Sequence, residues 1–403
     1  MSKEIKNHGF GALISPSDIR DYPAGSYLPE TTATSLDYFM QDDILDITYD
    51  QGITQKCVAY SLKQIVERFN KYEYDKYIPM SVDFLFSNRE IGQPSFLLLP
   101  FEGAYPKDLI QNLYKYGACE DSLCPTRQPD DFDDFINITN EMRAAASKYV
   151  IKMYLKVTTD EEIKSALVNG CGVTASIPIT PKFIGGYNEL ITEDYAKKTK
   201  IGNHMIVIYG WKKHNGKYYW VCKNSWGDDW GDNGFFYLPF GYVFNEIWAL
   251  TDKIFPHWSD KYYQYLTVNN GIVFDERGYD LPASRGYVFK YIAKVLGYQG
   301  EDVYDNYFNY LNTKIVVHEK RYEDNITRGE TFTMLARLKG YQEPTPNIPP
   351  HWAQKYYNYL TQECGMTIYE TRFNDLIKRS EVITLLARLM GFIEPSGEEA
   401  KRI

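Results

Sequence analysis

The sequence predicts an α+β fold for residues 1–252 and an all-α arrangement for residues 253–403. Three observations lead to this division. Apolar residues recur at helical spacing after Cys57, short apolar runs typical of strands occur between residues 204 and 239, and the sequence beyond residue 253 repeats itself. A chain of 403 residues is also long enough for two or three domains, at about 100–200 residues each.

A helix is expected to begin at Cys57. The apolar residues that would form its buried face are Val58, Leu62, Ile65, Val66 and Phe69. The N–H groups and dipole at a helix N-terminus lower the pKa of a thiol, and a positive charge on the neighbouring Lys56 acts in the same direction. Cys57 is therefore a candidate nucleophile if an imidazole lies beside it. The alternative is a small apolar residue that only begins a helix.

The candidate partners of Cys57 lie far downstream, at two expected strands. His204 precedes the apolar run 205–210, and a second run, 218–222, leads to Asn224. A catalytic histidine needs a hydrogen-bond partner on its far nitrogen to set its tautomer, and the Asn224 amide can supply one. Trp226 is large enough to shield that bond from water. A single histidine after a glycine is otherwise more often structural than catalytic.

These motifs resemble those of the papain-like cysteine peptidases. Three of them occur in that family's order: Gln51-Gly52 before Cys57, Gly202-Asn203-His204 and Asn224-Ser225-Trp226-Gly227. The resemblance covers about residues 15–249 and implies a two-lobed fold, with a helical lobe and an antiparallel β-rich lobe. It implies that Cys57 is the nucleophile and His204 the general base and later acid. Asn224 would orient His204, and the Gln51 side chain with the Cys57 N–H would form the oxyanion hole.

The same resemblance implies where substrate binds. Glu102-Gly103-Ala104 is similar to the segment whose backbone pairs with substrate as a short strand, and Asn203 and Trp226 are the other expected contacts. Residues 181–200, which directly precede His204, are expected to lie over the cleft and restrict access.

The chain departs from the family's pattern next to the nucleophile. Val58 replaces a frequent tryptophan, Gln55-Lys56 replaces Gly-Ser, and Thr54 replaces a cysteine, so the disulfide of that cysteine is absent. These differences bear on substrate range and rate more than on the chemistry.

Composition restricts the partners further. A net charge of −9 argues against nucleic-acid binding. Six cysteines are present, and if Cys57 is a free nucleophile the other five cannot all pair. Cys119 and Cys124 could pair, although mostly reduced cysteines are the preferred interpretation. The cysteine spacings do not predict zinc, so neither a metal nor another cofactor is expected. No secretory signal or transmembrane run is visible.

The last part of the chain is expected to contain three helix–loop–helix units, at about 253–299, 300–342 and 343–395. His257-Trp258 reappears as His351-Trp352, and the segment from Arg328 to Gly340 reappears from Arg379 to Gly391. Ser284-Arg285 begins a third related helix.

These units resemble S-layer homology repeats, three of which pack together and bind anionic secondary polysaccharide of the bacterial cell wall. The residues that the resemblance assigns to this polymer are Arg285, Arg328, Arg379, Trp258 and Trp352. Arginine beside helix N–H groups suits a carboxylate or ketal-pyruvate group. The alternative is that each arginine caps a turn or pairs with a nearby acid. The middle unit lacks the His-Trp pair and Tyr287 stands where Glu330 and Glu381 occur, so one or more grooves are expected to be silent.

Together the two parts predict a cysteine endopeptidase tethered to a Gram-positive-type cell envelope, which hydrolyses protein or peptide substrates through a thioester. One alternative is a phage- or wall-associated lysin that cleaves peptidoglycan cross-link peptides, and another is a non-catalytic structural protein bound to the wall. The predicted location is extracellular, with the cell wall, the S-layer or a phage virion.

Overall fold

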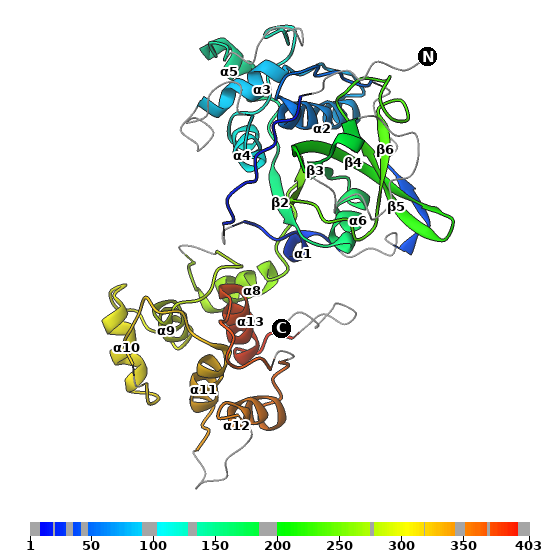
Figure 1. Cartoon of the computed structure of the whole chain (residues 1–403). Coiled ribbons are helices and arrows are strands. Elements are labelled where there is room, and N and C mark those ends of the chain that lie inside the picture. The colour runs from blue at the N-terminus through cyan, green and yellow to red at the C-terminus, as the bar shows by residue number, and fades with distance from the viewer. Residues whose placement is uncertain are drawn as a thin grey trace. The chain divides into compact units, whose positions relative to one another are not determined.

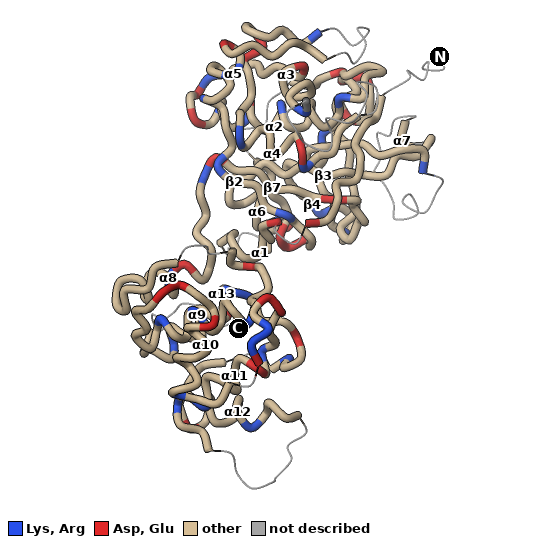
Figure 2. The backbone as a smooth tube through the Cα atoms, turned by 90° about the vertical axis from the view of Figure 1, so that its left-hand side faces the viewer, with Lys and Arg blue, Asp and Glu red and all other residues tan. Residues whose placement is uncertain are grey.

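The computed structural model divides the chain into two compact units, Met1–Phe255 and Pro256–Ile403 (Figure 1). The structure describes residues 9–18, 21–29, 35–41, 47–90, 103–127, 135–184, 200–274, 278–317, 319–342, 351–368 and 371–393. Acidic and basic residues are spread over both units (Figure 2). Among the described residues, no helix is both long enough and apolar enough to cross a bilayer.

The described part of the first unit contains one antiparallel sheet of seven strands. The strands are β1 (Tyr38–Met40), β2 (Met153–Val157), β3 (Gly172–Ile179), β4 (Gly202–His214), β5 (Lys217–Lys223), β6 (Phe235–Pro239) and β7 (Glu246–Thr251). Their order is β2-β7-β3-β4-β5-β6, and β1 pairs with β4. The strands predicted around residues 205–210, 218–222 and 235–239 are confirmed as β4, β5 and β6.

Helices surround this sheet. They are α1 (Ala24–Tyr27), α2 (Cys57–Tyr74), α3 (Val82–Ser87), the 3-10 turn η2 (Asn88–Glu90), α4 (Pro106–Tyr116), α5 (Asn140–Ala146), α6 (Asp160–Val168) and α7 (Pro181–Ile184). Helix α2, which confirms the helix predicted from Cys57, packs on β4 and β3. Alternate residues of β4, namely Met205, Val207 and Tyr209, share a core with α2 because side chains alternate between the faces of a strand. This packing places the first residue of α2 near the beginning of β4.

Helix α2 is buried around most of its circumference, and its charged side chains are therefore paired. Lys63 and Glu67 form a buried ion pair at 2.7 Å. Arg68 donates through Nη2 to the Gly170 carbonyl at 2.7 Å. A buried charge without a partner is costly, so these contacts allow α2 to lie between the sheet and the other helices of the lobe.

The described part of the second unit is helical. Its elements are α8 (Asp260–Asn270), α9 (Arg285–Val295), α10 (Tyr304–Asn312), α11 (Arg328–Leu338), α12 (Gln354–Asn358), the π-helical turn η6 (Tyr359–Glu363) and α13 (Arg379–Leu389). Helix α9 packs on α10, α11 on α12, and α13 on α8. Because the first helix pairs with the last, the three helix pairs close into a ring.

Hydrogen bonds between three loops hold this ring together. The Ala283 N–H donates to the Ile377 carbonyl at 2.8 Å, and the Ile377 N–H donates to the Ile326 carbonyl at 3.1 Å. The Ile326 N–H donates to the Ala283 carbonyl at 3.0 Å and completes the cycle. Each loop leads directly into one of α9, α11 and α13, so the three helices begin around one centre.

The arginines at these helix starts join neighbouring helices. Arg328 binds Glu381 of α13 at 2.6 Å, and only 7% and 8% of the two side chains are exposed. Arg285 forms an ion pair with Glu330 of α11. Arg379 lies over the ring of Tyr287 at 4.8 Å. Tyr287 takes the position in the repeat that is a glutamate in the partners of the other two arginines. The sequence left two roles open for these arginines, contact with a ligand or pairing with a nearby acid. For Arg285 and Arg328 the structure shows pairing with a nearby acid.

We expect loss of the Arg328–Glu381 pair to destabilise the second unit. The substitution Arg328→Met would leave the Glu381 carboxylate buried without its cation, which typically costs about 3–5 kcal/mol. The control is Arg372→Met, whose arginine is 66% exposed and pairs with Asp375, so the expected cost is below about 1 kcal/mol. Urea unfolding of the whole chain measures both, and equal shifts for the two variants would contradict a structural role for the pair.

Candidate active site

Cys57 is fully buried at the first turn of α2. Its sulfur accepts a hydrogen bond from the Gly11 N–H at 3.3 Å. Burial raises the pKa of the Cys57 thiol to about 11, and the nearby N–H groups of Gly11, Met205, Val58 and Ala12 lower it by less. The lowered thiol pKa expected from the helix N-terminus is therefore wrong for this structure, because desolvation outweighs the dipole.

The positive charge of Lys56 does not offset this burial. Lys56 Nζ binds Asp83 at 2.8 Å, and both side chains are buried. Arg127 also binds Asp83, through Nη2 at 3.1 Å. The expectation that Lys56 would favour a thiolate at Cys57 is not met, because Asp83 neutralises its charge.

His204 lies at the beginning of β4, and Asn224 follows β5. His204 Nε2 lies 2.6 Å from Asn224 Oδ1, and the same oxygen accepts the Ser225 N–H at 2.7 Å. An amide oxygen accepts hydrogen bonds, so Nε2 must carry the proton. In the neutral ring Nδ1 is then the nitrogen with a lone pair, which is the form that a general base needs.

Trp226 lies against this pair. Its ring centroid is 4.5 Å from that of His204, and its side chain is buried. The indole therefore shields the hydrogen bond to Asn224, as the sequence predicts.

Gln51 is joined to the loop that carries Asn224. Its N–H donates to the Ser225 carbonyl at 2.8 Å, and its side-chain Oε1 accepts the Ser225 hydroxyl at 2.6 Å. Its side-chain Nε2 donates to the carbonyls of Thr54 at 2.7 Å and Gly9 at 3.1 Å. Ser225, to which the sequence assigned no separate role, thus positions the amide that is expected to hold an oxyanion.

The residues expected to bind substrate all contact residues 9–13. Ala104 donates to the Gly11 carbonyl at 2.9 Å, and the Asn203 carbonyl accepts the Ala12 N–H at 3.3 Å. The Trp226 indole donates to the Gly9 carbonyl at 3.1 Å. Gly103 lies beside the Gly11 carbonyl, with a φ of +79° that favours glycine. Nothing in the sequence pointed to this N-terminal contact. Most of the segment 181–200, predicted to cover the cleft, lies outside the described residues.

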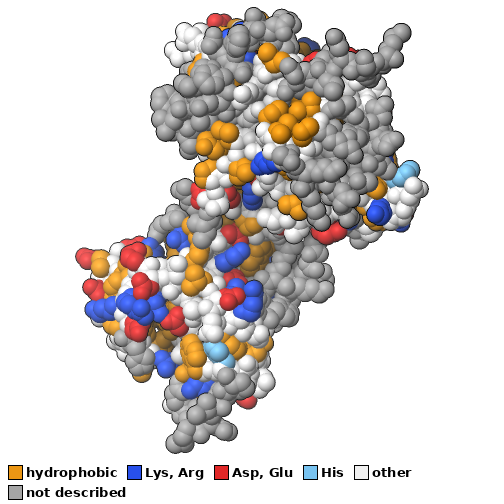
Figure 3. All heavy atoms as spheres, in the orientation of Figure 1, with side chains coloured by type: hydrophobic (Ala, Val, Ile, Leu, Met, Phe, Trp, Pro, Cys, Tyr) orange, Lys and Arg blue, Asp and Glu red, His pale blue; other side chains and the backbone are white. Residues whose placement is uncertain are grey.

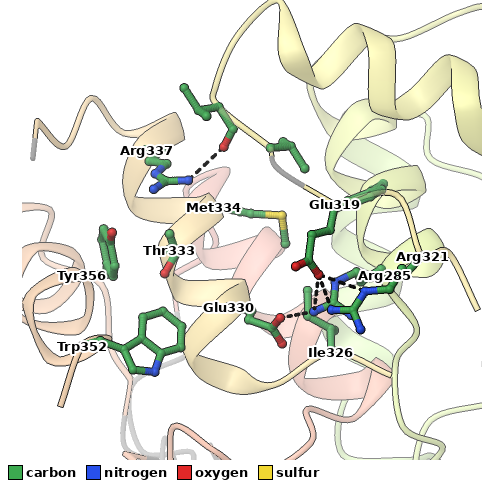
Figure 4. A pocket seen from close by; sticks show the side chains of 13 residues that line it. Arg285, Glu319, Arg321, Ile326, Glu330, Thr333, Met334, Arg337, Trp352 and Tyr356 are labelled. Atoms are coloured by element: carbon green, nitrogen blue, oxygen red, sulfur yellow. Dashed lines mark hydrogen bonds and ion pairs between the residues drawn. The ribbon is translucent and has the colours of Figure 1, made fainter. Parts of the chain in front are cut away.

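The second unit carries a pocket of about 350 Å³ between α9 and α12, alongside α11 (Figure 4). On one side Trp352, which is 48% exposed, and Tyr356 lie near Arg337 of α11. On the other side Arg285 and Arg321 lie among glutamates. The pocket therefore combines an exposed aromatic face with several guanidinium groups.

The pocket's aromatic side recurs at the helix pair α13·α8. Arg337 lies over the Tyr356 ring at 5.9 Å and donates to the Val316 carbonyl. Arg388 likewise lies over the ring of Tyr262 at 5.6 Å and donates to the Thr367 carbonyl. Trp258 lies edge-on to Tyr262, as Trp352 does to Tyr356.

The third helix pair, α9·α10, differs from the other two. Lys294 pairs with Asp302 at 3.9 Å, and the exposed Val303 precedes Tyr307 where Trp352 precedes Tyr356. Arg337 and Arg388 were not among the residues predicted to bind a ligand, although their recurrence within the repeated segment was a usable signal.

Comparison with known proteins agrees with the geometry of the first unit. The model of the papain family of cysteine proteases matches residues 34–245, more than half of the chain. Mouse pro-cathepsin H is 24% identical over 215 residues, which are 52% of this chain and 60% of that protein. The oryzain gamma chain of rice (Oryza sativa subsp. japonica) is 29% identical over 99 residues, 23% of this chain and 26% of that protein. The chain thus spans less than two thirds of the length of either relative.

Among solved structures, xylellain, a cysteine protease from Xylella fastidiosa, superposes with a TM-score of 0.52 at 21% identity. The match covers 62% of this chain and 98% of xylellain. The protein belongs to the papain family of cysteine proteases, which are hydrolases. The papain-like fold is confirmed, whereas the likeness of the second unit to S-layer homology repeats stays a prediction.

We expect Ser225→Ala to weaken turnover by acting on Gln51. The substitution removes the hydroxyl that holds Gln51 Oε1, and a hydrogen bond of this kind contributes about 0.5–1.5 kcal/mol, so kcat/KM should fall about 2- to 10-fold. Alkylation of Cys57 should keep its rate, because the sulfur is not touched. Ser122→Ala, on an exposed turn, is the control. A kcat/KM equal to that of the control would show that Ser225 does not position Gln51.

Proposed function

We propose that the protein hydrolyses peptide bonds through Cys57, His204, Asn224 and Gln51. The main observation behind this proposal is the 2.6 Å distance between His204 Nε2 and Asn224 Oδ1. The Ser225 N–H donates to the same oxygen, which fixes the orientation of the amide, so the oxygen is the acceptor and Nε2 carries the proton. In that tautomer His204 Nδ1 accepts the thiol proton of Cys57. The N–H of Met205, the residue after His204, is close enough to the Cys57 sulfur to lower the pKa of the thiol through a hydrogen bond. This supports a short distance between the Cys57 and His204 side chains.

The reaction is an acyl transfer in two stages. The Cys57 sulfur attacks the substrate carbonyl carbon, and Gln51 Nε2 and the Cys57 N–H donate hydrogen bonds to the oxygen on which negative charge develops. The protonated His204 then gives its proton to the leaving amine, which leaves a thioester on Cys57. His204 next removes a proton from water, and the oxygen of that water attacks the thioester carbonyl carbon. The bond from this carbon to the Cys57 sulfur then breaks, the acid product leaves, and His204 returns its proton to the sulfur.

The substrate is proposed to be an extended peptide. The Ala104 N–H and carbonyl and the Asn203 carbonyl form backbone hydrogen bonds with residues 11–13, and Gly11 of that segment contacts the Cys57 sulfur. Backbone groups in this arrangement bind another backbone as an added strand, so they recognise main chain before side chain.

We further propose that the second unit tethers the enzyme to anionic polysaccharide of a cell wall, which places it outside the cell. The pocket beside α11 offers an aromatic face at Trp352 for a sugar ring and the Arg337 guanidinium for a carboxylate. On the face drawn in Figure 3, acidic and basic side chains of this unit are mixed. Local geometry rather than bulk charge would therefore select the ligand.

The peptidase proposal predicts that Cys57→Ser removes hydrolysis of casein and of a peptide library. Loss of a catalytic nucleophile typically lowers kcat by about 10⁴–10⁶-fold. The matched control is Cys364→Ser, at a partly exposed free cysteine of the second unit, which should keep full activity. Residual proteolysis in the Cys57 variant would refute the mechanism. Purified peptidoglycan, assayed in parallel, separates a wall-peptide substrate from a protein substrate.

The tethering proposal predicts that Trp352→Ala weakens binding to purified anionic wall polysaccharide without changing peptidase activity. Loss of an aromatic face beside a guanidinium is expected to raise Kd about tenfold. Val303→Ala is the control, because Val303 takes the place of Trp352 at the third helix pair. Titration calorimetry on the whole chain measures both, and equal affinities for the two variants would count against this pocket.

A further inference from the structure

Tyr49 contacts three of the segments that carry candidate catalytic residues. It lies two residues before Gln51, and its carbonyl accepts the N–H of Gly227, in the loop after β5, at 2.9 Å. Its hydroxyl donates to Glu67 Oε2 on α2, the helix that begins at Cys57. One residue thus joins the segment of the oxyanion donor, the loop after β5 and the helix of the nucleophile.

The backbone of Tyr49 belongs to a short antiparallel ladder between residues 49–51 and 225–227. The Gln51 N–H donates to the Ser225 carbonyl at 2.8 Å, and the next pair of residues along forms an antiparallel bridge. The ladder does not include the nucleophile. The chain joins it to Cys57 only through a few residues that form neither helix nor strand, so a second connection to α2 can fix its place.

Glu67 is a firm attachment point for that second connection. Its side chain is fully buried, and both carboxylate oxygens accept hydrogen bonds. Oε1 accepts Lys63 Nζ at 2.7 Å and the Met80 N–H at 2.8 Å, while Oε2 accepts the Tyr49 hydroxyl. Hydrogen bonds to a charged group are stronger than those between neutral groups, so the Tyr49 hydroxyl is held tightly to α2.

The ring of Tyr49 is held as well as its hydroxyl. Lys63 Nζ lies 4.8 Å from the centroid of this ring, and the centroid of the Tyr60 ring lies 6.1 Å away. The Tyr77 hydroxyl lies 2.9 Å from that of Tyr49 and is the donor, because Tyr49 gives its own proton to Glu67. A tyrosine has only two side-chain torsions, so a side chain held in this way acts as a short rigid connection.

We propose that Tyr49, through its bond to Glu67, is a positioning residue that keeps the nucleophile and the oxyanion donor at a fixed distance. This inference rests on the proposed peptidase function. A shift of α2 along its axis would move the Cys57 sulfur relative to Gln51 Nε2, and the Tyr49–Glu67 bond opposes that shift. Turnover is sensitive to such a shift, because a misplacement of about 1 Å can cost about 100-fold in rate.

The test compares the whole chain with Tyr49→Phe, which removes the hydroxyl but keeps the ring and the Lys63–Glu67 pair. On a peptide substrate, kcat should fall about 10-fold with KM unchanged, a smaller loss than the roughly 10²–10³-fold caused by removing an oxyanion donor. KM should be spared because other backbone groups are proposed to bind the peptide.

Two further measurements separate positioning from a general loss of structure. A peptide aldehyde forms a hemithioacetal with Cys57 that places an oxygen where the oxyanion forms, and it should bind Tyr49→Phe about 10-fold more weakly. Alkylation of Cys57 by iodoacetamide should keep its rate, because that reaction needs the sulfur but no oxyanion donor. Urea unfolding checks that each variant is folded under the assay conditions.

Tyr149→Phe is the matched control. Tyr149 also donates to a glutamate, Glu120, at 2.7 Å, but neither residue belongs to α2 or to the ladder. This variant should match the whole chain in kcat, aldehyde affinity and alkylation rate. Tyr77→Phe is a second test variant, and because its hydroxyl donates to that of Tyr49, it should show the pattern of Tyr49→Phe with a smaller loss of kcat.

Equal kcat and equal aldehyde affinity for Tyr49→Phe and Tyr149→Phe would overturn the positioning role. An alkylation rate that falls as much as kcat would also overturn it, because the sulfur itself would then be affected. A weaker aldehyde complex of Tyr49→Phe, in a chain that hydrolyses no peptide, would uphold the positioning role and refute the proposed function, so the two failures are distinguishable.

Discussion

The contact between His204 Nε2 and Asn224 Oδ1 is the interaction on which the candidate site depends. The short loop that carries Asn224 also carries Ser225, whose backbone and hydroxyl hold Gln51 from both ends. One loop therefore sets the tautomer of the base and the position of the oxyanion donor together. The sulfur comes from a separate element, α2, and it reaches the same place because α2 packs on β4, which begins next to His204.

Burial, rather than the helix dipole, decides the state of Cys57 in this structure. A helix N-terminus typically contributes about 0.3–1 kcal/mol, whereas removal of an ion from water costs several. Gly11 adds to this burial, because its N–H lies against the sulfur at 3.3 Å. The position of Cys57 at the start of a helix therefore does not by itself make its thiol reactive.

The arginines of the second unit fall into two groups with different contacts. Arg285 and Arg328 at the helix starts join neighbouring helices through glutamates, and with the cyclic hydrogen bonds of the three loops they stabilise the ring. Arg337 and Arg388 lie near the other end of α11 and α13, over the rings of Tyr356 and Tyr262. The repeat thus places one arginine where it joins neighbouring helices and a second beside an aromatic side chain.

The sequence alone determined the helix from Cys57, the strands at β4, β5 and β6, and the family, because spacing of apolar residues and the order of motifs are local properties. It also brought out His204 and Asn224 as a pair, since a strand start and a strand end with complementary side chains can be recognised without coordinates.

The tertiary structure decided what those residues face. Asp83 neutralises Lys56, and Glu330 and Glu381 pair with Arg285 and Arg328. Gly11 covers the Cys57 sulfur. Each of these contacts comes from a segment remote in sequence. Spacing along the chain carries no record of such contacts, because desolvation and ion pairing depend on which distant surfaces meet. The same reason explains why the sequence identified the reactive residues of this protein but not that its own N-terminal segment lies upon them.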